Sequence, residues 1–307
     1  MFDTNSVIGV IGAGTMGAGI AQVAAQAGHP VLLFDAAEGA AARGRDGVAK
    51  GLQKLVERGK MTAEAVEALV ARIAPIASLE EMAPAALVIE AIVERLDVKQ
   101  SVFGQLEEIC SESTVLATNT SSISVTAIGS TLKRPQNLVG MHFFNPAPIM
   151  KLVEVISGLD TRQDVADAIY SLSASWGKKP VHAKSTPGFI VNRVARPFYA
   201  EGFRISQEGG ADNATIDAVI REAGGFRMGP FELTDLIGHD VNYAVTSSVF
   251  AAYYNDQRFL PSLIQLELVN AGHFGRKSGK GFYDYREGAV KPQPQTCLLY
   301  TSPSPRD

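Results

Sequence analysis

Residues 7–35 read V-I-G-V-I-G-A-G-T-M-G-A-G-I-A-Q-V-A-A-Q-A-G-H-P-V-L-L-F-D. The apolar run Val7–Ile11 is typical of a buried parallel strand. A glycine-rich turn follows it, then an apolar helix and a second strand, Val31–Phe34. The turn has the pattern G-x-G-x-x-G, whose glycines allow a tight turn, close approach of the backbone to a pyrophosphate, and close helix–strand packing. This order of elements predicts a dinucleotide-binding domain, with contacts from Gly12, Gly14, Thr15, Met16 and Gly17.

Asp35 ends the second strand, at about the 20-residue spacing from the glycine turn at which an acidic residue binds the adenosine ribose hydroxyls. A carboxylate at this position repels a 2′-phosphate, and neither Ala36 nor Ala37 supplies a cation to offset it. Arg43 and Arg45 are close in sequence, but we expect them farther along the next helix. The sequence therefore favours NAD over NADP.

The composition indicates a globular protein with room for two domains: 307 residues, 46% hydrophobic and 20% charged. A formal net charge of −4 gives no basic field for nucleic acid or an anionic membrane. Cys110 and Cys297 form neither a disulfide framework nor a metal-ligand spacing, so we expect a reducing compartment and no metal site. The sequence shows no signal-peptide pattern and no apolar run of membrane-spanning length. We therefore expect a cytoplasmic protein without nucleic-acid or membrane partners.

Two later strands of the same α/β pattern are followed by polar side chains. Leu87–Ile89 leads into E-A-I-V-E at residues 90–94, and Val115–Thr118 leads into N-T-S-S at residues 119–122. Ligands of an open α/β sheet bind outside the carboxyl ends of its strands. Turn chemistry with a helix cap would also account for the N-T-S-S cluster. In this context Ser121 is a candidate donor to a substrate oxygen.

The stretch Gly140–Ile156 contains a candidate acid/base unit. A strand that includes Leu138–Met141 delivers His142, and after a proline-rich loop the apolar run Leu152–Ile156 carries Glu154. Because side chains alternate along a strand, Glu154 can point back at His142. A carboxylate fixes the tautomer and orientation of an imidazole that transfers protons. The alternative interpretation is a buried histidine satisfied by a glutamate for structural reasons.

Helical periodicity predicts an insertion in the nucleotide domain and a second domain after it. Residues 36–59 and 62–72 predict a helical hairpin, on which Lys50, Lys54 and Arg58 share one face. That face is either a solvated surface or an arm that meets a polyphosphate ligand. From Thr186 onward only helical periodicity remains, and Thr186-Pro187 is a good helix start. Pro197 should kink or break that helix.

We therefore expect an α/β domain over residues 1–184, built on a doubly wound sheet with the inserted hairpin. An all-α domain over residues 185–287 follows, and its surplus of apolar residues predicts a partner subunit. Residues 288–307 have neither helical nor strand periodicity, and from residue 296 we interpret them as a non-native end without function.

Seven motifs between Val7 and Tyr285 form a recognisable set: G-A-G-T-M-G-A-G-I-A-Q-V-A-A, V-I-E-A-I-V-E, N-T-S-S, H-F-F-N-P-A-P-I-M-K-L-V-E-V, T-P-G-F-I-V-N-R, M-G-P-F-E-L-T-D and F-G-R-K-S-G-K-G-F-Y. Together they resemble the L-3-hydroxyacyl-CoA dehydrogenases, particularly bacterial 3-hydroxybutyryl-CoA dehydrogenases. The similarity implies a Rossmann-type NAD domain followed by a helical dimerisation domain, hence a homodimer.

The resemblance implies a role for each matching residue. His142 would be the general base that takes the C3 hydroxyl proton while hydride passes to NAD, with Glu154 orienting it. Ser121 would hydrogen-bond the substrate oxygen and also lie at the cofactor, and Asn192 would fix the substrate near the reacting carbon. Coenzyme A would lie against the hairpin, with Lys50 and Lys54 as candidate contacts, although Gly51 replaces a serine found in relatives. Family positions near the cofactor match Glu94, Lys99, Asn119, Asn145 and Lys277.

The substrate is open at this level. A short acyl chain such as 3-hydroxybutyryl and a carboxylated chain, 3-hydroxyadipyl, are both compatible; Arg193 and Arg196 are candidates to bind a distal carboxylate if their side chains face the substrate. A sugar-acid dehydrogenase would leave the basic hairpin unexplained. A non-catalytic NAD-binding protein would not need the set Ser121, His142, Glu154 and Asn192.

Overall fold

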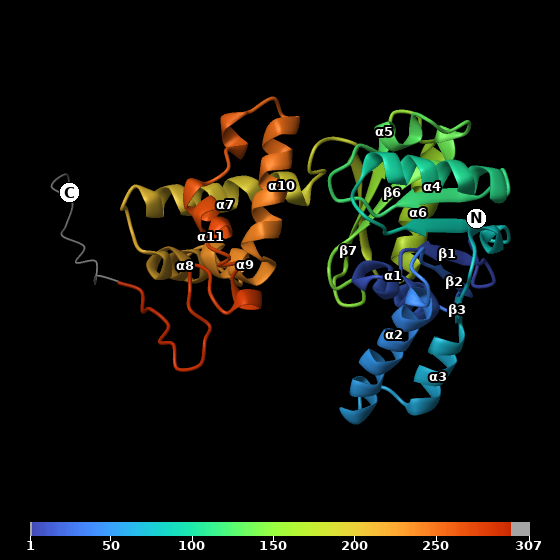
Figure 1. The fold of residues 1–307 in the computed structure, drawn as a ribbon, viewed down its shortest axis with the longest axis horizontal. Coiled ribbons are helices and arrows are strands. Elements are labelled where there is room, and N and C mark those ends of the chain that lie inside the picture. Colours follow the sequence, from blue (N-terminus) through green and yellow to red (C-terminus); the bar gives the residue numbers. More distant parts are fainter. Residues whose placement is uncertain (1, 296–307) are drawn as a thin grey trace, which may run out of the picture. The chain divides into compact units, whose positions relative to one another are not determined.

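The computed structural model describes residues 2–295 (Figure 1). The chain divides into two compact units between Ile190 and Val191. The segment from residue 296 onward, interpreted above as non-native, lies outside the described residues. Among residues 2–295, no helix has both the length and the apolar character needed to cross a bilayer.

The N-terminal unit is built on an eight-stranded sheet with the order β3-β2-β1-β4-β5-β6-β7-β8. All neighbouring strands are parallel except β6 and β7, which are antiparallel. The order 3-2-1-4-5-6 is that of dinucleotide-binding sheets, so the predicted doubly wound α/β fold is confirmed. The strands are β1 (Ile8–Ile11), β2 (Val31–Phe34), β3 (Ile73–Pro75), β4 (Leu87–Glu90), β5 (Val115–Thr118), β6 (Leu138–Phe143), β7 (Leu152–Ser157) and β8 (Lys179–Lys184).

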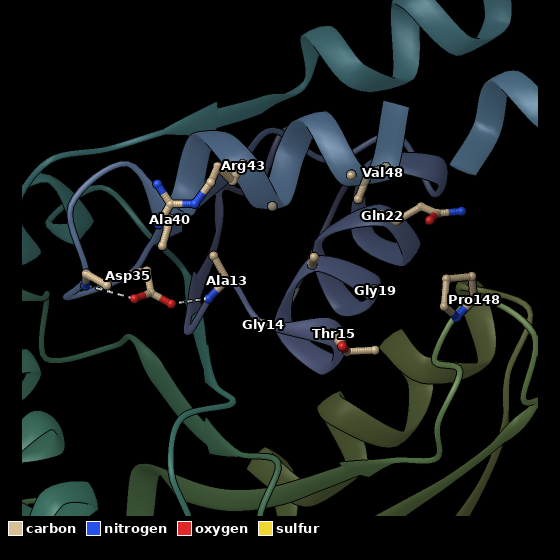
Figure 2. Close-up of a pocket in the computed structure, with 14 residues that line it drawn as sticks. Ala13, Gly14, Thr15, Gly19, Gln22, Asp35, Ala40, Arg43, Val48 and Pro148 are labelled. Atoms are coloured by element: carbon tan, nitrogen blue, oxygen red, sulfur yellow. Dashed lines mark hydrogen bonds between the residues drawn. The ribbon is translucent and has the colours of Figure 1, made fainter. Parts of the chain in front are cut away.

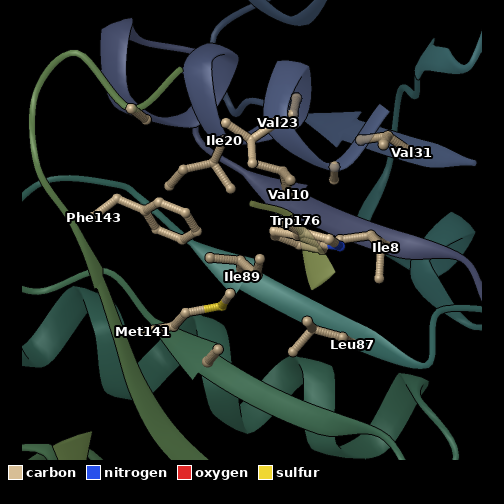
Figure 3. Close-up of a cluster of buried hydrophobic side chains, with 14 of the residues drawn as sticks. Ile8, Val10, Ile20, Val23, Val31, Leu87, Ile89, Met141, Phe143 and Trp176 are labelled. Carbon is tan, nitrogen blue, oxygen red and sulfur yellow. The ribbon is translucent and has the colours of Figure 1, made fainter. Parts of the chain in front are cut away.

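Helices cover both faces of this sheet. On one face, side chains such as Ile20 and Val23 of α1 (Thr15–Gln26) pack with Ile8, Val10 and Ile89 of the sheet (Figure 3). Helix α6 (Gln163–Ser175) contributes to the same core, while α4 (Leu96–Ile109) and α5 (Val125–Gly129) cover the opposite face. Each fully buried Val, Leu or Ile stabilises the fold by about 1.5–3 kcal/mol relative to exposure.

The predicted hairpin consists of α2 (Ala40–Glu57) and α3 (Ala63–Ala71), which lie side by side and project from the sheet (Figure 1). The Thr62 side chain caps α3, as predicted, by accepting a hydrogen bond of 3.2 Å from the Ala65 N–H. Val48 and Leu52 turn one stripe of α2 into the core. The opposite face of α2 is therefore available to solvent or ligand.

The C-terminal unit is helical, as predicted, but it starts later. Residues 185–190 form turns, in which Gly188 and Phe189 have φ angles of 72° and 47°. These left-handed conformations are incompatible with a helix starting at Thr186, so that prediction is wrong. The helices are α7 (Val191–Gln207), α8 (Asn213–Glu222), α9 (Pro230–Ile237), α10 (His239–Ala252) and α11 (Leu263–Asn270).

Pro197 lies inside α7, and the helix continues through it to Gln207. Of the two outcomes expected at Pro197, a kink or a break, the break is absent, because tertiary packing of α7 outweighs the loss of one backbone hydrogen bond. A helix starting at Thr186 would place Asn192 in its second turn. Because α7 starts at Val191, Asn192 lies in the first turn instead.

The buried carboxylate of Asp235 holds the segment at Phe282 and Tyr283 onto the helices. Asp235 accepts hydrogen bonds of 2.9 Å from the backbone N–H groups of Phe282 and Tyr283, and it also pairs with His239 at 2.6 Å. A Cβ atom on Gly281 would lie 2.0 Å from Oδ1 of Asp235. The motifs M-G-P-F-E-L-T-D and F-G-R-K-S-G-K-G-F-Y therefore belong to one packed unit.

Candidate active site

The glycine turn between β1 and α1 has room only for glycine at two positions. Gly12 has a φ angle of 94°, and a Cβ atom on Gly17 would lie 1.7 Å from the carbonyl oxygen of Gly12. Gly14 forms the N-cap of α1 without a side-chain hydrogen bond. The first backbone N–H groups of α1 are thus presented as an anion site, which fits the pyrophosphate of a dinucleotide.

Asp35 is fixed beside this turn. Its Oδ2 accepts a hydrogen bond of 2.7 Å from the Ala13 N–H, and its Oδ1 accepts one of 2.9 Å from the Ala37 N–H (Figure 2). Asp35 lines a cavity of about 630 Å³ together with Gly14 and Thr15. The free lone pairs of the carboxylate can accept the ribose hydroxyls of NAD. Met16 lies elsewhere and packs against the hydrophobic core.

Arg43 differs from its expected place. It lines the same cavity as Asp35 and donates a hydrogen bond of 3.1 Å to the carbonyl oxygen of Glu38 (Figure 2). The expectation that it lies too far along the helix is therefore wrong, because α2 starts at Ala40 and places Arg43 in its first turn. The predicted preference for NAD over NADP therefore depends on repulsion between the Asp35 carboxylate and a 2′-phosphate, since Arg43 offers a cation in the same cavity.

His142 and Glu154 face each other across β6 and β7. The antiparallel register places them directly opposite, with Nδ1 of His142 2.7 Å from Oε2 of Glu154. Both side chains are buried. Glu154 Oε1 accepts a hydrogen bond of 2.9 Å from the Ile190 N–H. Since a carboxylate accepts, Nδ1 carries the proton in the neutral imidazole and Nε2 is left as the base.

The polar turns after β4 and β5 meet at Glu94. Its Oε1 accepts hydrogen bonds from the Thr120 hydroxyl at 2.6 Å, from the Ser121 N–H at 3.0 Å and from the Ser122 N–H at 3.1 Å. Burial raises the pKa of Glu94, but the Lys99 ammonium and the hydroxyl donors hold it below its usual value. Glu94 thus orders the N-T-S-S turn and stays ionised.

Asn119 ties this turn to the histidine strand. Its Oδ1 accepts a hydrogen bond of 2.8 Å from the Phe143 N–H, the residue after His142. The turn that carries Ser121 and the strand that carries His142 are therefore fixed relative to each other within the N-terminal unit.

Glu90 is a residue that the sequence analysis left without a role. It is fully buried at the end of β4, and Lys99 pairs with it at 2.6 Å and with Glu94 at 3.2 Å. The Thr118 hydroxyl donates to its second oxygen at 2.8 Å. A glutamate that closes an apolar strand, with a lysine in the first turn of the next helix, is the sequence signal for this pair.

The remaining predicted site residues lie in separate places. Asn145 is exposed in the loop after β6 and precedes a cis peptide bond to Pro146. Lys50 and Lys54 are exposed on α2, beyond the part of that helix that lines the cavity. Lys277 belongs to the C-terminal unit, where its Nζ lies 2.6 Å from Oδ1 of Asp240.

The loop between His142 and Glu154 is anchored by a lysine that sequence reasoning missed. Nζ of Lys178 donates hydrogen bonds to the carbonyl oxygens of Ala147 at 2.5 Å and Met150 at 2.9 Å. Burial lowers the pKa of Lys178. The lysine precedes β8, so it fastens the proline-rich loop to the sheet.

Two family models match almost the entire described chain. Residues 7–186 match the NAD-binding domain of 3-hydroxyacyl-CoA dehydrogenase, and residues 188–285 match its C-terminal domain. NAD is therefore the cofactor that this family's N-terminal domain binds, as the sequence predicts.

Named relatives agree with these models. The chain is 56% identical to 3-hydroxyadipyl-CoA dehydrogenase of Escherichia coli over 91% of its length, and it spans 59% of that longer relative. It is 40% identical to 3-hydroxybutyryl-CoA dehydrogenase of Clostridioides difficile, covering 91% of this chain and 99% of the relative.

A solved structure, (S)-3-hydroxybutyryl-CoA dehydrogenase of Ralstonia eutropha, superposes with a TM-score of 0.88. It shares 37% identity, and the match covers 92% of this chain and 100% of that one. Because sequence and fold agree through both units, the chain belongs to the 3-hydroxyacyl-CoA dehydrogenase family, the oxidoreductases that its motifs predicted.

Proposed function

We propose that the protein catalyses the reversible, NAD-dependent oxidation of (S)-3-hydroxyacyl-CoA to 3-oxoacyl-CoA. The observation that carries this proposal is the buried His142–Glu154 pair, joined by a hydrogen bond of 2.7 Å at the end of β6. The relatives described above have hydroxyacyl-CoA names, which supports an acyl-CoA substrate. The chain spans only 59% of the Escherichia coli relative. We therefore base the proposed activity on the residues of this chain and not on the relative's name alone.

His142 is the proton acceptor in this mechanism. Nε2 takes the proton of the C3 hydroxyl, and Glu154 stabilises the imidazolium that forms. When bound, NAD supplies the hydride acceptor for C3. In the reverse direction His142 returns the proton to the carbonyl oxygen. Since the Ile190 N–H holds the second oxygen of Glu154, the pair keeps one geometry in both directions.

Two further residues hold the substrate in this proposal. Ser121 donates its hydroxyl to the C3 oxygen from the turn that Glu94 orders. Asn192, in the first turn of α7, binds the substrate near the reacting carbon and thioester. Neither role requires these residues to be charged.

Coenzyme A is proposed to lie along α2. The cavity that starts at Asp35 continues along this helix to Val48, and Lys50 and Lys54 are exposed beyond it. Cations on that exposed face suit the phosphates of coenzyme A. We also propose that Asn145 and Lys277 contact NAD on its nicotinamide side.

A second candidate for the substrate is 3-hydroxyadipyl-CoA. The relative with that name is 56% identical, whereas the Clostridioides difficile 3-hydroxybutyryl-CoA dehydrogenase is 40% identical. The difference favours a carboxylated acyl chain over an unsubstituted short one.

We also propose a homodimer that forms through the C-terminal unit and a cytoplasmic location. Large apolar side chains are exposed on that unit, including Val194, Val219, Phe226 and Val241. Exposed apolar groups of this kind suit burial against a second copy. Sedimentation of the protein at several concentrations tests the dimer.

The proposed reaction is tested by supplying (S)-3-hydroxybutyryl-CoA or 3-hydroxyadipyl-CoA with NAD and measuring the rate at which NADH forms. The R enantiomers and NADP serve as controls and should react poorly. If NADH binds tightly but neither substrate is oxidised, the protein is a non-catalytic NAD-binding protein instead.

A further inference from the structure

Arg196 is a buried cation on α7, with 4% of its surface exposed. Its Nε donates a hydrogen bond of 3.0 Å to the carbonyl oxygen of Asn192. Its Nη1 donates to the carbonyl oxygen of Asn242 at 3.2 Å and to the hydroxyl of Thr246 at 2.8 Å, both on α10. Three of its five N–H groups are therefore used within the helical unit, all on neutral acceptors.

No carboxylate of residues 2–295 forms an ion pair with Arg196. The ring of Tyr199, 5.0 Å from Cζ, is its nearest aromatic partner, and burial raises the pKa of that phenol, which stays uncharged. Burial lowers the pKa of Arg196 itself. Buried charges in proteins are normally paired with an opposite charge, so this guanidinium lacks the partner expected of it.

The unused side of the guanidinium is Nη2. Its two N–H groups have no acceptor among the described residues. Among the described residues, the fully buried side-chain nitrogen and oxygen atoms without a hydrogen-bond partner include none of Arg196. Nη2, which has no partner, therefore keeps some solvent-accessible surface. Nη2 is therefore the nitrogen of this guanidinium that has hydrogen-bond donors left for an anion.

Arg196 lies on the same helix, α7, as Asn192, the residue proposed to bind the substrate. Arg196 follows Asn192 by four residues, so the two side chains lie on one face of the helix, about 6 Å apart along its axis. Asn192 is the residue proposed to hold the substrate near C3. A carboxylate at C6 of an acyl chain lies three carbons beyond C3, a comparable distance.

We propose that Arg196 binds the distal carboxylate of a dicarboxylic 3-hydroxyacyl-CoA and so sets the substrate class of the enzyme. The inference rests on the proposed function and narrows it to acyl chains with a terminal carboxylate at C6. The guanidinium gains its missing counter-ion when such a substrate binds, and a methyl group at C6 leaves it unpaired. Arg196 thereby acts as a specificity-determining residue rather than a catalytic one.

Two other roles make different predictions. If Arg196 only positions Asn192 and joins α7 to α10, its loss should affect all acyl chains equally. If Arg193 reads the carboxylate instead, loss of Arg193 should change the substrate preference. Arg193 is exposed, and its Cζ lies 5.7 Å from the centroid of the Tyr253 ring, so it is a matched neighbouring control.

The experiment compares kcat/KM for 3-hydroxyadipyl-CoA and 3-hydroxyhexanoyl-CoA, which differ only in the group at C6. We expect the native protein to favour the adipyl substrate. Arg196→Leu should lower the adipyl-to-hexanoyl ratio by on the order of 10- to 100-fold, the range for a hydrogen bond between charged groups. Arg196→Lys should recover part of the ratio, and Arg193→Leu should leave it unchanged.

A native ratio at or below one would overturn the inference even if no variant folds. An equal loss for both substrates in Arg196→Leu, or a collapsed ratio in Arg193→Leu, would also overturn it. In each of these cases hexanoyl oxidation by the native protein still supports the proposed function. Failure of the native protein on both substrates would instead remove the proposed function itself.

Discussion

His142 and Glu154 are directly paired residues of two antiparallel strands, and Nδ1 of the histidine lies 2.7 Å from Oε2 of the glutamate. The strand register orients the imidazole, because it determines which two side chains face each other. The Ile190 N–H holds the other carboxylate oxygen, so the glutamate cannot rotate away without losing a second bond.

Glu154→Gln should lower kcat by on the order of 10²- to 10⁴-fold, the range typical of proton transfer by a positioned side chain. The amide keeps the shape of the carboxylate but removes the charge that stabilises the imidazolium. NADH binding and the unfolding temperature should change little, and steady-state kinetics with a binding titration measure all three. An unchanged kcat would mean that the pair is structural.

Asp35→Ser should improve the use of NADPH. The variant removes the carboxylate that repels a 2′-phosphate, and it leaves the Arg43 guanidinium in the same cavity to pair with that phosphate. We expect kcat/KM for NADPH to rise roughly tenfold relative to NADH, which corresponds to about 1.4 kcal/mol. The double variant Asp35→Ser/Arg43→Ala should lose that gain; if it keeps the gain, Arg43 plays no part.

Lys99→Met should destabilise the N-terminal unit. Lys99 is buried between Glu90 and Glu94, and its removal leaves the fully buried Glu90 without a cation. Breaking one partner of a buried pair costs about 3–5 kcal/mol of unfolding free energy. Chemical denaturation measures it, with Lys133→Met as the control, because the Lys133–Glu108 pair is exposed and should contribute little. Equal effects of the two variants would contradict this account.

The acid limit of stability should depend on Glu94. Burial opposes its ionisation, but Lys99 and the donor hydroxyls hold the pKa of Glu94 below the ordinary 4.5. A group with a lowered pKa in the folded state stabilises the fold above its unfolded pKa and loses that contribution as pH falls through the folded pKa. The loss should therefore occur below pH 4.5.

Thr120→Val removes one of those donors, so its acid-side loss should begin at a higher pH than in the native protein. Unfolding free energies measured across the acid range test this, and Ser113→Ala, which alters an exposed hydroxyl outside this cluster, is the control. Coincident profiles for the native protein and Thr120→Val would contradict the assignment.

Much of the fold could be predicted because its elements are locally encoded. The strand Val31–Phe34 and the glycine turn were predicted at the residue level, since burial and tight turns leave few residue choices. The opposition of His142 and Glu154 followed from alternation along two strands. Their catalytic roles, and those of the other proposed site residues, stay predictions.

Other features depend on packing that sequence periodicity does not carry. The strand Ile73–Pro75 has only three residues, too few to show a strand periodicity in the sequence. The Glu90–Lys99 pair joins a strand to a helix, a contact that only the tertiary fold creates. The helix predicted to start at Thr186 fails because Gly188 and Phe189 adopt left-handed conformations. Periodicity places Arg196 on the face of Asn192, but only the packing of α10 shows that it is buried.

The central claim is that His142 transfers the proton in a 3-hydroxyacyl-CoA dehydrogenase reaction. Its most direct test is NADH oxidation with acetoacetyl-CoA by the native protein and by His142→Ala, with NADH affinity measured for both. We expect rapid turnover by the native protein and a loss of about 10²-fold or more in the variant at unchanged NADH affinity. Turnover by the variant at the native rate would contradict the account.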